Sequence, residues 1–255
     1  MRTQFKAAIV AAALFAAGPA FADAASSFHD GKWQDAITQG RAENTAASLV
    51  LAGRAALSVA GFTITDKAQA KTAIAAAERD FDAAIAKAPN NLEARVQKAI
   101  AVGYRAKLDK SPGEAKDTRR LMEAVLARDP NNALGNAALG GWHGGAVATL
   151  GNFIASTILG ANRKDMERCF SIAMARDPKN IVHPLTYAFT LLDISTDNAP
   201  QATQLLKAAV MLPSRDAYEV QTRKVAVQVL AALNSGDAKG ARALARRLQP
   251  FGTVS

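Results

Sequence analysis

Apolar residues recur at positions i, i+4 and i+7 in five stretches of the chain, and a proline follows each stretch. Met166, Phe170 and Ala173 form one such stripe, and Pro178 ends its helix because proline lacks the N–H that a helix needs. The other stripes are Ala77, Phe81 and Ala84 before Pro89; Thr118, Met122 and Val125 before Pro130; Gln201, Leu205 and Ala208 before Pro213; and, more faintly, Ala238, Arg242 and Ala245 before Pro250. A helix with one apolar stripe buries it against a neighbour, so the pattern predicts packed helices.

The spacing of these prolines indicates internal repetition. They lie 41, 48, 35 and 37 residues apart, a period that is typical of helical hairpins stacked in a row. No stretch alternates β-branched or aromatic residues with polar ones, as a half-buried strand would. We therefore predict an all-α chain, an α-α superhelix of about five to six helical hairpins.

Caps and turns place several helix boundaries. The pattern predicts helices over residues 33–43, 45–59 and 66–87. Asparagines precede three further predicted starts, at Leu92, Ala133 and Ile181, and can cap them. Two stronger start signals have an acidic residue three positions after the cap, namely Ser111-Pro112-Gly113-Glu114 and Asp216 with Glu219.

The first 22 residues have the three parts of a secretory signal. Arg2 and Lys6 precede the uncharged run AAIVAAALFAAGPA, and the small residues of Ala20-Phe21-Ala22 suit a cleavage point after Ala22. A first helix or a membrane anchor is the alternative, but the run is short and ends in Gly18-Pro19. We predict a signal peptide over residues 1–22 and a soluble periplasmic or secreted domain over residues 23–255.

The chain is basic, with a formal net charge of +9 and a sequence pI near 9.8. The densest basic groups, at residues 105–120 and 239–247, suit anionic partners, and contact with an acidic membrane surface stays open. Acids are interspersed in the first group, as on an ordinary solvated helix face, so nucleic acid is not an expected partner. The single cysteine, Cys169, lies beside a stripe residue, which predicts a buried side chain without an intrachain disulfide.

Catalytic patterns are missing from the sequence. His29, His143 and His183 lie far apart, and none belongs to a metal-binding spacing. The sequence contains neither a Gly-x-Ser-x-Gly turn nor a phosphate-binding Gly-Lys-Ser/Thr loop. We therefore expect no enzyme activity, no metal and no cofactor, and we interpret His143, beside Trp142, as a hydrogen-bonded structural residue.

The repeat pattern resembles the tetratricopeptide repeat family, whose units are 34-residue antiparallel helix pairs. Asn131–Gly140, NNALGNAALG, is similar to the opening of such a repeat, with Leu139-Gly140 at the usual Leu-Gly position. Thr118, Gln201 and Arg242 depart from the family pattern. A narrower similarity, carried by Leu-Gly-x-Trp and a following apolar insert, is to bacterial relatives of the regulator of microtubule dynamics family. The resemblance implies a helical-repeat fold, while a tubulin function does not fit an exported protein.

The insert lies in a stretch of 33 residues, from Pro130 to Asn162, without Asp, Glu, Lys or Arg. An additional helix is expected over residues 146–159, and three interpretations remain open. A membrane span is long enough, but the many glycines disfavour it. A buried helix at the centre of the array fits the same glycines. In the third interpretation, the insert folds back and partly fills the inner groove.

Bound peptides in the tetratricopeptide family lie mainly along the first helix of each pair. The positions that this resemblance assigns to the groove are apolar, and we predict a pocket near Trp142, His143 and Phe189. The predicted groove residues are Val96, Ile100, Tyr104, Trp142, His143, Val182, Leu185 and Phe189. The expected function is protein–protein interaction by a binding or scaffold protein, with a protein or peptide partner. The alternative is a carrier of a small apolar molecule or an accessory subunit of an envelope transporter.

Overall fold

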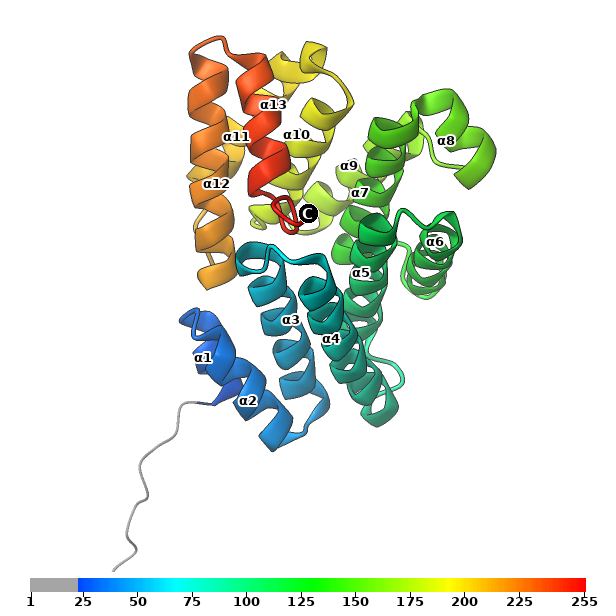
Figure 1. Ribbon diagram of the computed structural model, residues 1–255, viewed down its shortest axis with the longest axis vertical. Helices are drawn as coiled ribbons and strands as arrows, with labels where there is room; N and C mark the ends of the chain where they lie inside the picture. The colour runs from blue at the N-terminus through cyan, green and yellow to red at the C-terminus, as the bar shows by residue number, and fades with distance from the viewer. Residues whose placement is uncertain (1–22) are drawn as a thin grey trace, which may run out of the picture.

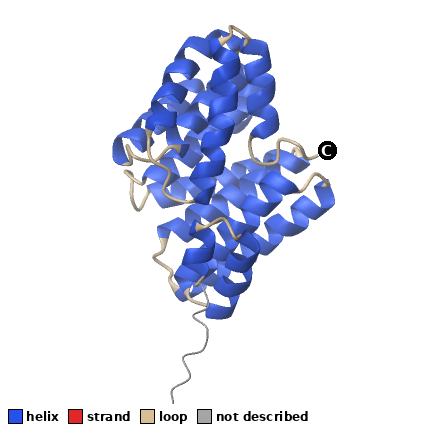
Figure 2. Ribbon diagram, turned by 90° about the vertical axis from the view of Figure 1, so that its left-hand side faces the viewer, coloured by secondary structure: helices blue, strands red, loops and turns tan. Residues whose placement is uncertain are grey.

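Residues 23–255 of the computed structural model form thirteen α-helices and one short 3-10 helix, and this part of the chain contains no strand (Figure 2). The all-α prediction is confirmed, whereas the predicted signal peptide, residues 1–22, lies outside the described residues. The helices are α1 (Ala24–His29), α2 (Trp33–Glu43), α3 (Ala46–Thr63), α4 (Lys67–Lys87), α5 (Leu92–Asp109), α6 (Pro112–Leu126), α7 (Ala133–Leu150), α8 (Asn152–Leu159), α9 (Arg163–Arg176), α10 (Val182–Ile194), η1 (Thr196–Asn198), α11 (Ala199–Met211), α12 (Ala217–Asn234) and α13 (Ala238–Leu248).

Side-chain caps explain where many of these helices begin. Asp66 accepts a hydrogen bond from the Gln69 N–H at 2.8 Å, and Ser111 caps α6 in the same way, with Pro112 as the first helical residue. The side chains of Asn91, Asn132 and Asn162 cap α5, α7 and α9. Each such cap stabilises its helix by about 1 kcal/mol. The predicted starts at Leu92 and Ala133 are confirmed, and so are the bounds of α2, residues 33–43.

Successive helices pack side by side from α1 to α7, and again from α9 to α13. A second set of contacts links helices that are not consecutive in the chain, because α5 touches both α3 and α7, and α7 touches α10. The first and last parts of the chain also meet, since α1 contacts α12. In Figure 1 the C-terminus lies near the middle of the view, between the upper helices and α3. The chain therefore curves back toward its own beginning.

Three of the five predicted apolar stripes are buried as expected. Every stripe side chain of α4, α6 and α9 is at most 3% exposed. The fourth stripe was placed one residue too early, since the buried side chains of α11 are Ala202, Leu206 and Ala209. Pro213 follows the last residue of this stripe by four positions, whereas the other prolines follow their stripes by five. In α13 the buried residues are Ala241 and Ala245, so Arg242 is not a stripe position.

The insert differs from the predicted single helix over residues 146–159. Helix α7 continues to Leu150, and the chain then bends at Gly151, whose φ of +77° is readily adopted by glycine alone. Helix α8 follows and ends at Gly160, which has φ +68°. Gly151 thus divides the charge-free stretch into the end of α7 and a separate eight-residue helix, which ends at the left-handed Gly160.

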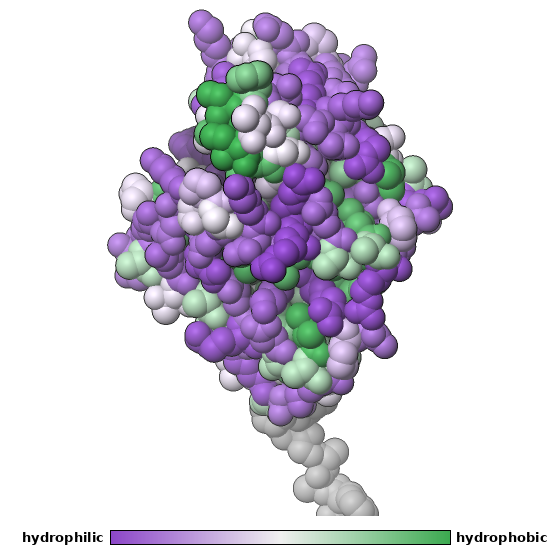
Figure 3. Space-filling view, turned by 90° about the vertical axis from the view of Figure 1, so that its right-hand side faces the viewer, coloured by the Kyte–Doolittle hydropathy of each residue, from purple (hydrophilic) through white to green (hydrophobic). Residues whose placement is uncertain are grey.

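Helix α8 packs on the side formed by α6 and α7. Its buried residues Ala155 and Leu159 belong to a cluster with Trp142 and Ala115. Its other apolar residues face solvent, and Phe153 is 82% exposed, with Ile154 and Ile158 about half exposed. Figure 3 shows hydrophobic residues gathered among hydrophilic ones in the upper part of this side of the molecule. The insert therefore covers Trp142 and packs against α6 and α7, with much of its apolar surface left exposed.

Among the described helices, α3 alone is long and apolar enough to cross a membrane by length and composition. The mean hydropathy of its 18 residues is 1.4, and 61% of them are buried in this fold. Burial of that extent is typical of a core helix.

The adjacent glycines of α7 should respond oppositely to alanine. A Cβ at residue 144 would lie 2.0 Å from Thr190 Cγ2, whereas a Cβ at residue 145 has no atom within 4 Å. Overpacking should make Gly144→Ala less stable by about 1–3 kcal/mol. Gly145→Ala should gain up to about 1 kcal/mol, because alanine has the higher helix propensity. Urea unfolding of both variants tests this, and equal effects would contradict the packing described here.

Candidate functional site

The last residues of the chain bind back onto its N-terminal helices. This C-terminal segment, residues 249–255, follows α13 and reaches the end of α3. The Phe251 N–H donates to the Gly61 carbonyl at 2.8 Å, and the Ser255 N–H donates to the Thr65 carbonyl at 3.1 Å. Gly61 belongs to the last turn of α3, where carbonyls lack partners within the helix. The segment thus satisfies backbone acceptors that a helix end leaves free.

Phe251 anchors the segment. Its side chain is 5% exposed, and the centroid of its ring lies 4.6 Å from that of Tyr104 on α5. Gly61 permits this approach, since a Cβ there would lie 2.9 Å from Pro250 Cβ. The backbone of Phe251 is left-handed, with φ +62°, a conformation that costs a bulky residue about 1–2 kcal/mol. The surrounding contacts hold it there.

The structure disperses the predicted groove residues. Four of the eight are buried in the packing, and the other four are half-buried. Phe189 packs with Leu185 against α11, α12 and α13, while Trp142 belongs to clusters formed with α6, α8 and α9. The expected pocket near Trp142, His143 and Phe189 is therefore not formed by these three side chains together. Tyr104 alone among the eight lies against the C-terminal segment through an aromatic contact. The buried residues are Val96, His143, Leu185 and Phe189, and the half-buried ones are Ile100, Tyr104, Trp142 and Val182.

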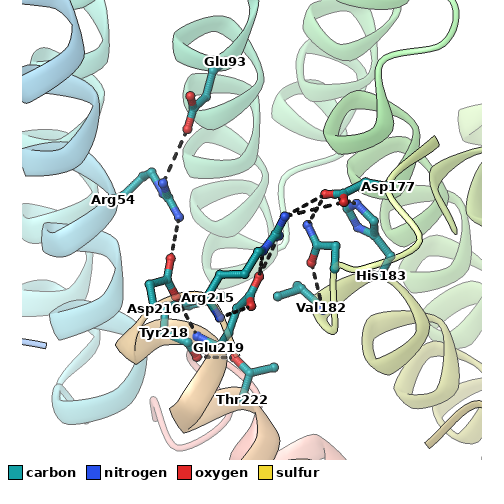
Figure 4. Close-up of polar contacts among 11 residues, drawn as sticks. Arg54, Glu93, Asp177, Val182, His183, Arg215, Asp216, Tyr218, Glu219 and Thr222 are labelled. Carbon is teal, nitrogen blue, oxygen red and sulfur yellow. Dashed lines mark hydrogen bonds and ion pairs between the residues drawn. The ribbon is translucent and has the colours of Figure 1, made fainter. Parts of the chain in front are cut away.

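A polar network joins helices from the first and last thirds of the chain (Figure 4). Arg54 of α3 forms an ion pair with Glu93 of α5 at 3.5 Å and another with Asp216, the cap of α12, at 3.6 Å. Arg215, the residue before Asp216, binds Glu219 through its Nε at 2.7 Å and Asp177 through its Nη1 at 3.1 Å. The network thus connects α3 and α5 with the start of α12 and the turn before α10.

Charges in the network are matched to their partners. Burial works to raise the pKa of Asp177, but the hydrogen bond from Asn180 and the charge of Arg215 lower that pKa below its ordinary value. Glu219 is 3% exposed and accepts both the side-chain and the backbone N–H of Arg215. Burying a carboxylate without such donors would cost free energy of folding. The charged side chains of the network are therefore bound to one another and are not free to bind a ligand.

Aromatic rings strengthen the same closure. Trp33 of α2 stacks on Phe62 of α3 with a centroid separation of 6.2 Å, and Phe62 lies 6.0 Å from Tyr218 of α12. Burial raises the pKa of Tyr218, so its phenol stays neutral at physiological pH. Aromatic contacts thus join α2 and α3 to α12, and a further one joins α5 to the C-terminal segment.

Two histidines are buried and neutral. His143 is 2% exposed, and its Nδ1 accepts the Asn162 N–H at 3.3 Å, as expected for a structural imidazole. His183 is also 2% exposed, and its Nε2 lies 3.9 Å from Asp177. Burial lowers the pKa of each to about 4. Cys169 is buried, and burial raises the pKa of its thiol. Within residues 23–255, no group of three or more His, Cys, Asp or Glu is arranged to hold a metal ion.

Comparison of the chain with protein-family models gives no match, and comparison with curated proteins gives none either.

Sequence reasoning did not find the C-terminal segment as a binding element. Pro250 was used only as the end of the last repeat, and Phe251 follows it directly. The one available signal was a large aromatic residue beyond the last helix, where burial needs a surface elsewhere in the fold. Nothing in the local pattern pointed to Gly61 and Tyr104 as that surface.

Proposed function

We propose that this chain is an exported binding protein of the tetratricopeptide type, which holds a short segment of a protein partner on its inner side. Six helix pairs follow one another along the chain, with α8 inserted within the fourth: α1 with α2, α3 with α4, α5 with α6, α7 with α9, α10 with α11, and α12 with α13. Contacts between α3 and α5, between α5 and α7, and between α7 and α10 support an inner row made of the first helix of each pair.

The observation that carries the proposal is the way in which the C-terminal segment is held. Main-chain hydrogen bonds to Gly61 and Thr65 and one aromatic anchor at Tyr104 bind it. The backbone bonds do not depend on side-chain identity, and the aromatic anchor supplies selectivity. A partner with an aromatic residue in a similar turn could use the same contacts once the protein's own segment leaves.

The alternative, a carrier of a small apolar molecule, has less support. A carrier needs an enclosed apolar cavity. Two surface pockets, of about 480 and 240 Å³, both contain several charged side chains. We therefore favour the peptide-binding function and the exported location that the N-terminal sequence indicates.

A peptide supplied in trans tests this proposal. A fluorescent peptide with the sequence of residues 249–255 should bind a chain that ends at Leu248. The full-length chain should bind the peptide far more weakly, because the attached segment competes at an effective concentration in the millimolar range. Replacing phenylalanine by alanine in the peptide should weaken binding about 10- to 100-fold, from the lost burial of the ring. Fluorescence anisotropy measures all three affinities.

Circular dichroism of the shortened chain is the necessary control. If that chain unfolds, the full-length variant Phe251→Ala replaces it, because this variant keeps the rest of the segment. Should a folded acceptor fail to bind the peptide, or bind the alanine peptide equally well, the proposed binding site would be rejected.

A further inference from the structure

Helix α13 places its basic residues along one side. Lys239, Arg242 and Arg246 follow at i, i+3 and i+7, and Arg247 adjoins them, so they project toward the same region. The opposite side carries Ala241 and Ala245, which are buried against α10 and α12. The apolar side fixes the helix, and the basic side is left to solvent.

These residues line a groove of about 480 Å³, here called the basic groove. Its other walls include Thr196 of η1 and Gly252 of the C-terminal segment. The four basic residues are Lys239, Arg242, Arg246 and Arg247, and none of the described residues that line the groove is acidic. The basic groove thus borders the segment that occupies the proposed partner site.

Two of the arginines are held in position from one side. Arg242 donates through Nη2 to the Asp193 carbonyl at 2.6 Å, and Arg246 pairs with the Asp193 carboxylate. The Nε of Arg242 is buried and makes no hydrogen bond within residues 23–255.

The other two basic side chains of the groove are available to bind a ligand. Lys239 and Arg247 are exposed, and neither forms an ion pair among the described residues. Fixed guanidinium groups bind carboxylates with two parallel hydrogen bonds, and the mobile lysine adds a point charge. The groove therefore combines two positioned donors with two adaptable ones.

We propose that the basic groove binds an acidic, Asp- or Glu-rich stretch of the same partner segment whose aromatic residue takes the place of Phe251. This inference rests on the proposed function, because Gly252 lies in both the basic groove and the C-terminal segment. A concave groove suits a narrow polypeptide better than a flat bilayer. The net charge, +9 for the full chain and 29 − 22 = +7 without Arg2 and Lys6 of the predicted signal, also favours approach of an acidic chain over long distances.

Binding of fluorescent hexaglutamate to the full-length protein tests the inference without requiring the C-terminal segment to leave. The variant Lys239→Glu/Arg247→Glu reverses two exposed groove charges, and its affinity should fall about tenfold or more at low salt. The matched control is Arg120→Glu/Lys164→Glu, which changes net charge by the same amount at exposed positions outside the groove. The control should retain affinity within about twofold, and anisotropy measures all three proteins.

Each other outcome overturns the assignment. Absence of hexaglutamate binding, or equal losses in the two variants, would show that the groove does not select acidic chains. Competition by tripolyphosphate or by phosphatidylglycerol vesicles at lower charge concentration than hexaglutamate would assign the groove to phosphate groups or to a membrane instead. Failure of the tail peptide to bind the shortened chain would reject the proposed function separately, because that experiment leaves the groove charges unchanged.

Discussion

Phe170→Ala should destabilise the protein by about 3–5 kcal/mol, the largest effect expected of a single substitution here. The Phe170 side chain is fully buried, and its ring stacks on Tyr187 with a centroid separation of 4.7 Å. It also fills the space opposite Gly140, where a Cβ would lie 3.1 Å from the ring. Alanine would leave a cavity between α7, α9 and α10 that these closely packed helices cannot collapse to fill.

Urea unfolding monitored by circular dichroism measures this loss. Phe153→Ala is the matched control, because Phe153 is 82% exposed on α8 and its removal should change stability by at most about 0.5 kcal/mol. A loss of 3–5 kcal/mol is a large part of the roughly 5–15 kcal/mol that stabilises a typical domain. Equal effects of the two substitutions would contradict the burial described for α9.

Acid should destabilise the protein through its two buried histidines, by up to about 3 kcal/mol for each. In the unfolded chain a histidine binds a proton near pH 6.5. In the folded protein, burial lowers the pKa of His143 and His183 to about 4. Stability is therefore unaffected by these groups above about pH 6.5, and it falls as pH drops from there toward 4 because only the unfolded chain gains the protons.

Neighbouring charges modify this effect without reversing it. Asp177 favours the protonated form of His183, whereas Arg215 opposes it. Around His143 the acids Asp165 and Glu123 act against Arg119 and Arg168. In both sites burial is the largest contribution, so the direction is the same.

Urea midpoints measured between pH 7 and pH 4.5 test the two sites separately. His183→Gln and His143→Gln should each remove about one proton from the pH dependence, and glutamine can still accept the Asn162 N–H at position 143. If wild type and both glutamine variants lose stability in parallel, the histidines do not carry the acid effect.

The sequence allowed the helices and most of their buried faces to be predicted, because stripe residues and caps act locally. Phe81, Met122 and Phe170 were identified as buried from their spacing alone. The register of α11 was wrong by one residue because the distance from stripe to proline varies between repeats. Short α1 was missed, because six residues carry too little periodicity to stand out.

Most of the candidate site could not be predicted from local sequence patterns. Tyr104 was predicted to line the inner surface, but the residue that covers it, Phe251, lies 147 positions away in the sequence. The sequence also does not distinguish Gly144 from Gly145 of α7, although Gly144 faces Thr190 and Gly145 faces solvent. Such differences arise from tertiary packing between distant elements, for which the repeat pattern contains no signal.

The long sequence separation between Phe251 and the surface that it covers means that this surface is completed late during synthesis. The Tyr104 ring is made 147 residues before Phe251, and Gly61 is made earlier still. While the intervening helices are made, this surface therefore has no cover from its own chain. Foreign residues fused next to Ser255 would lie beside Thr65, because the Ser255 N–H donates to the Thr65 carbonyl.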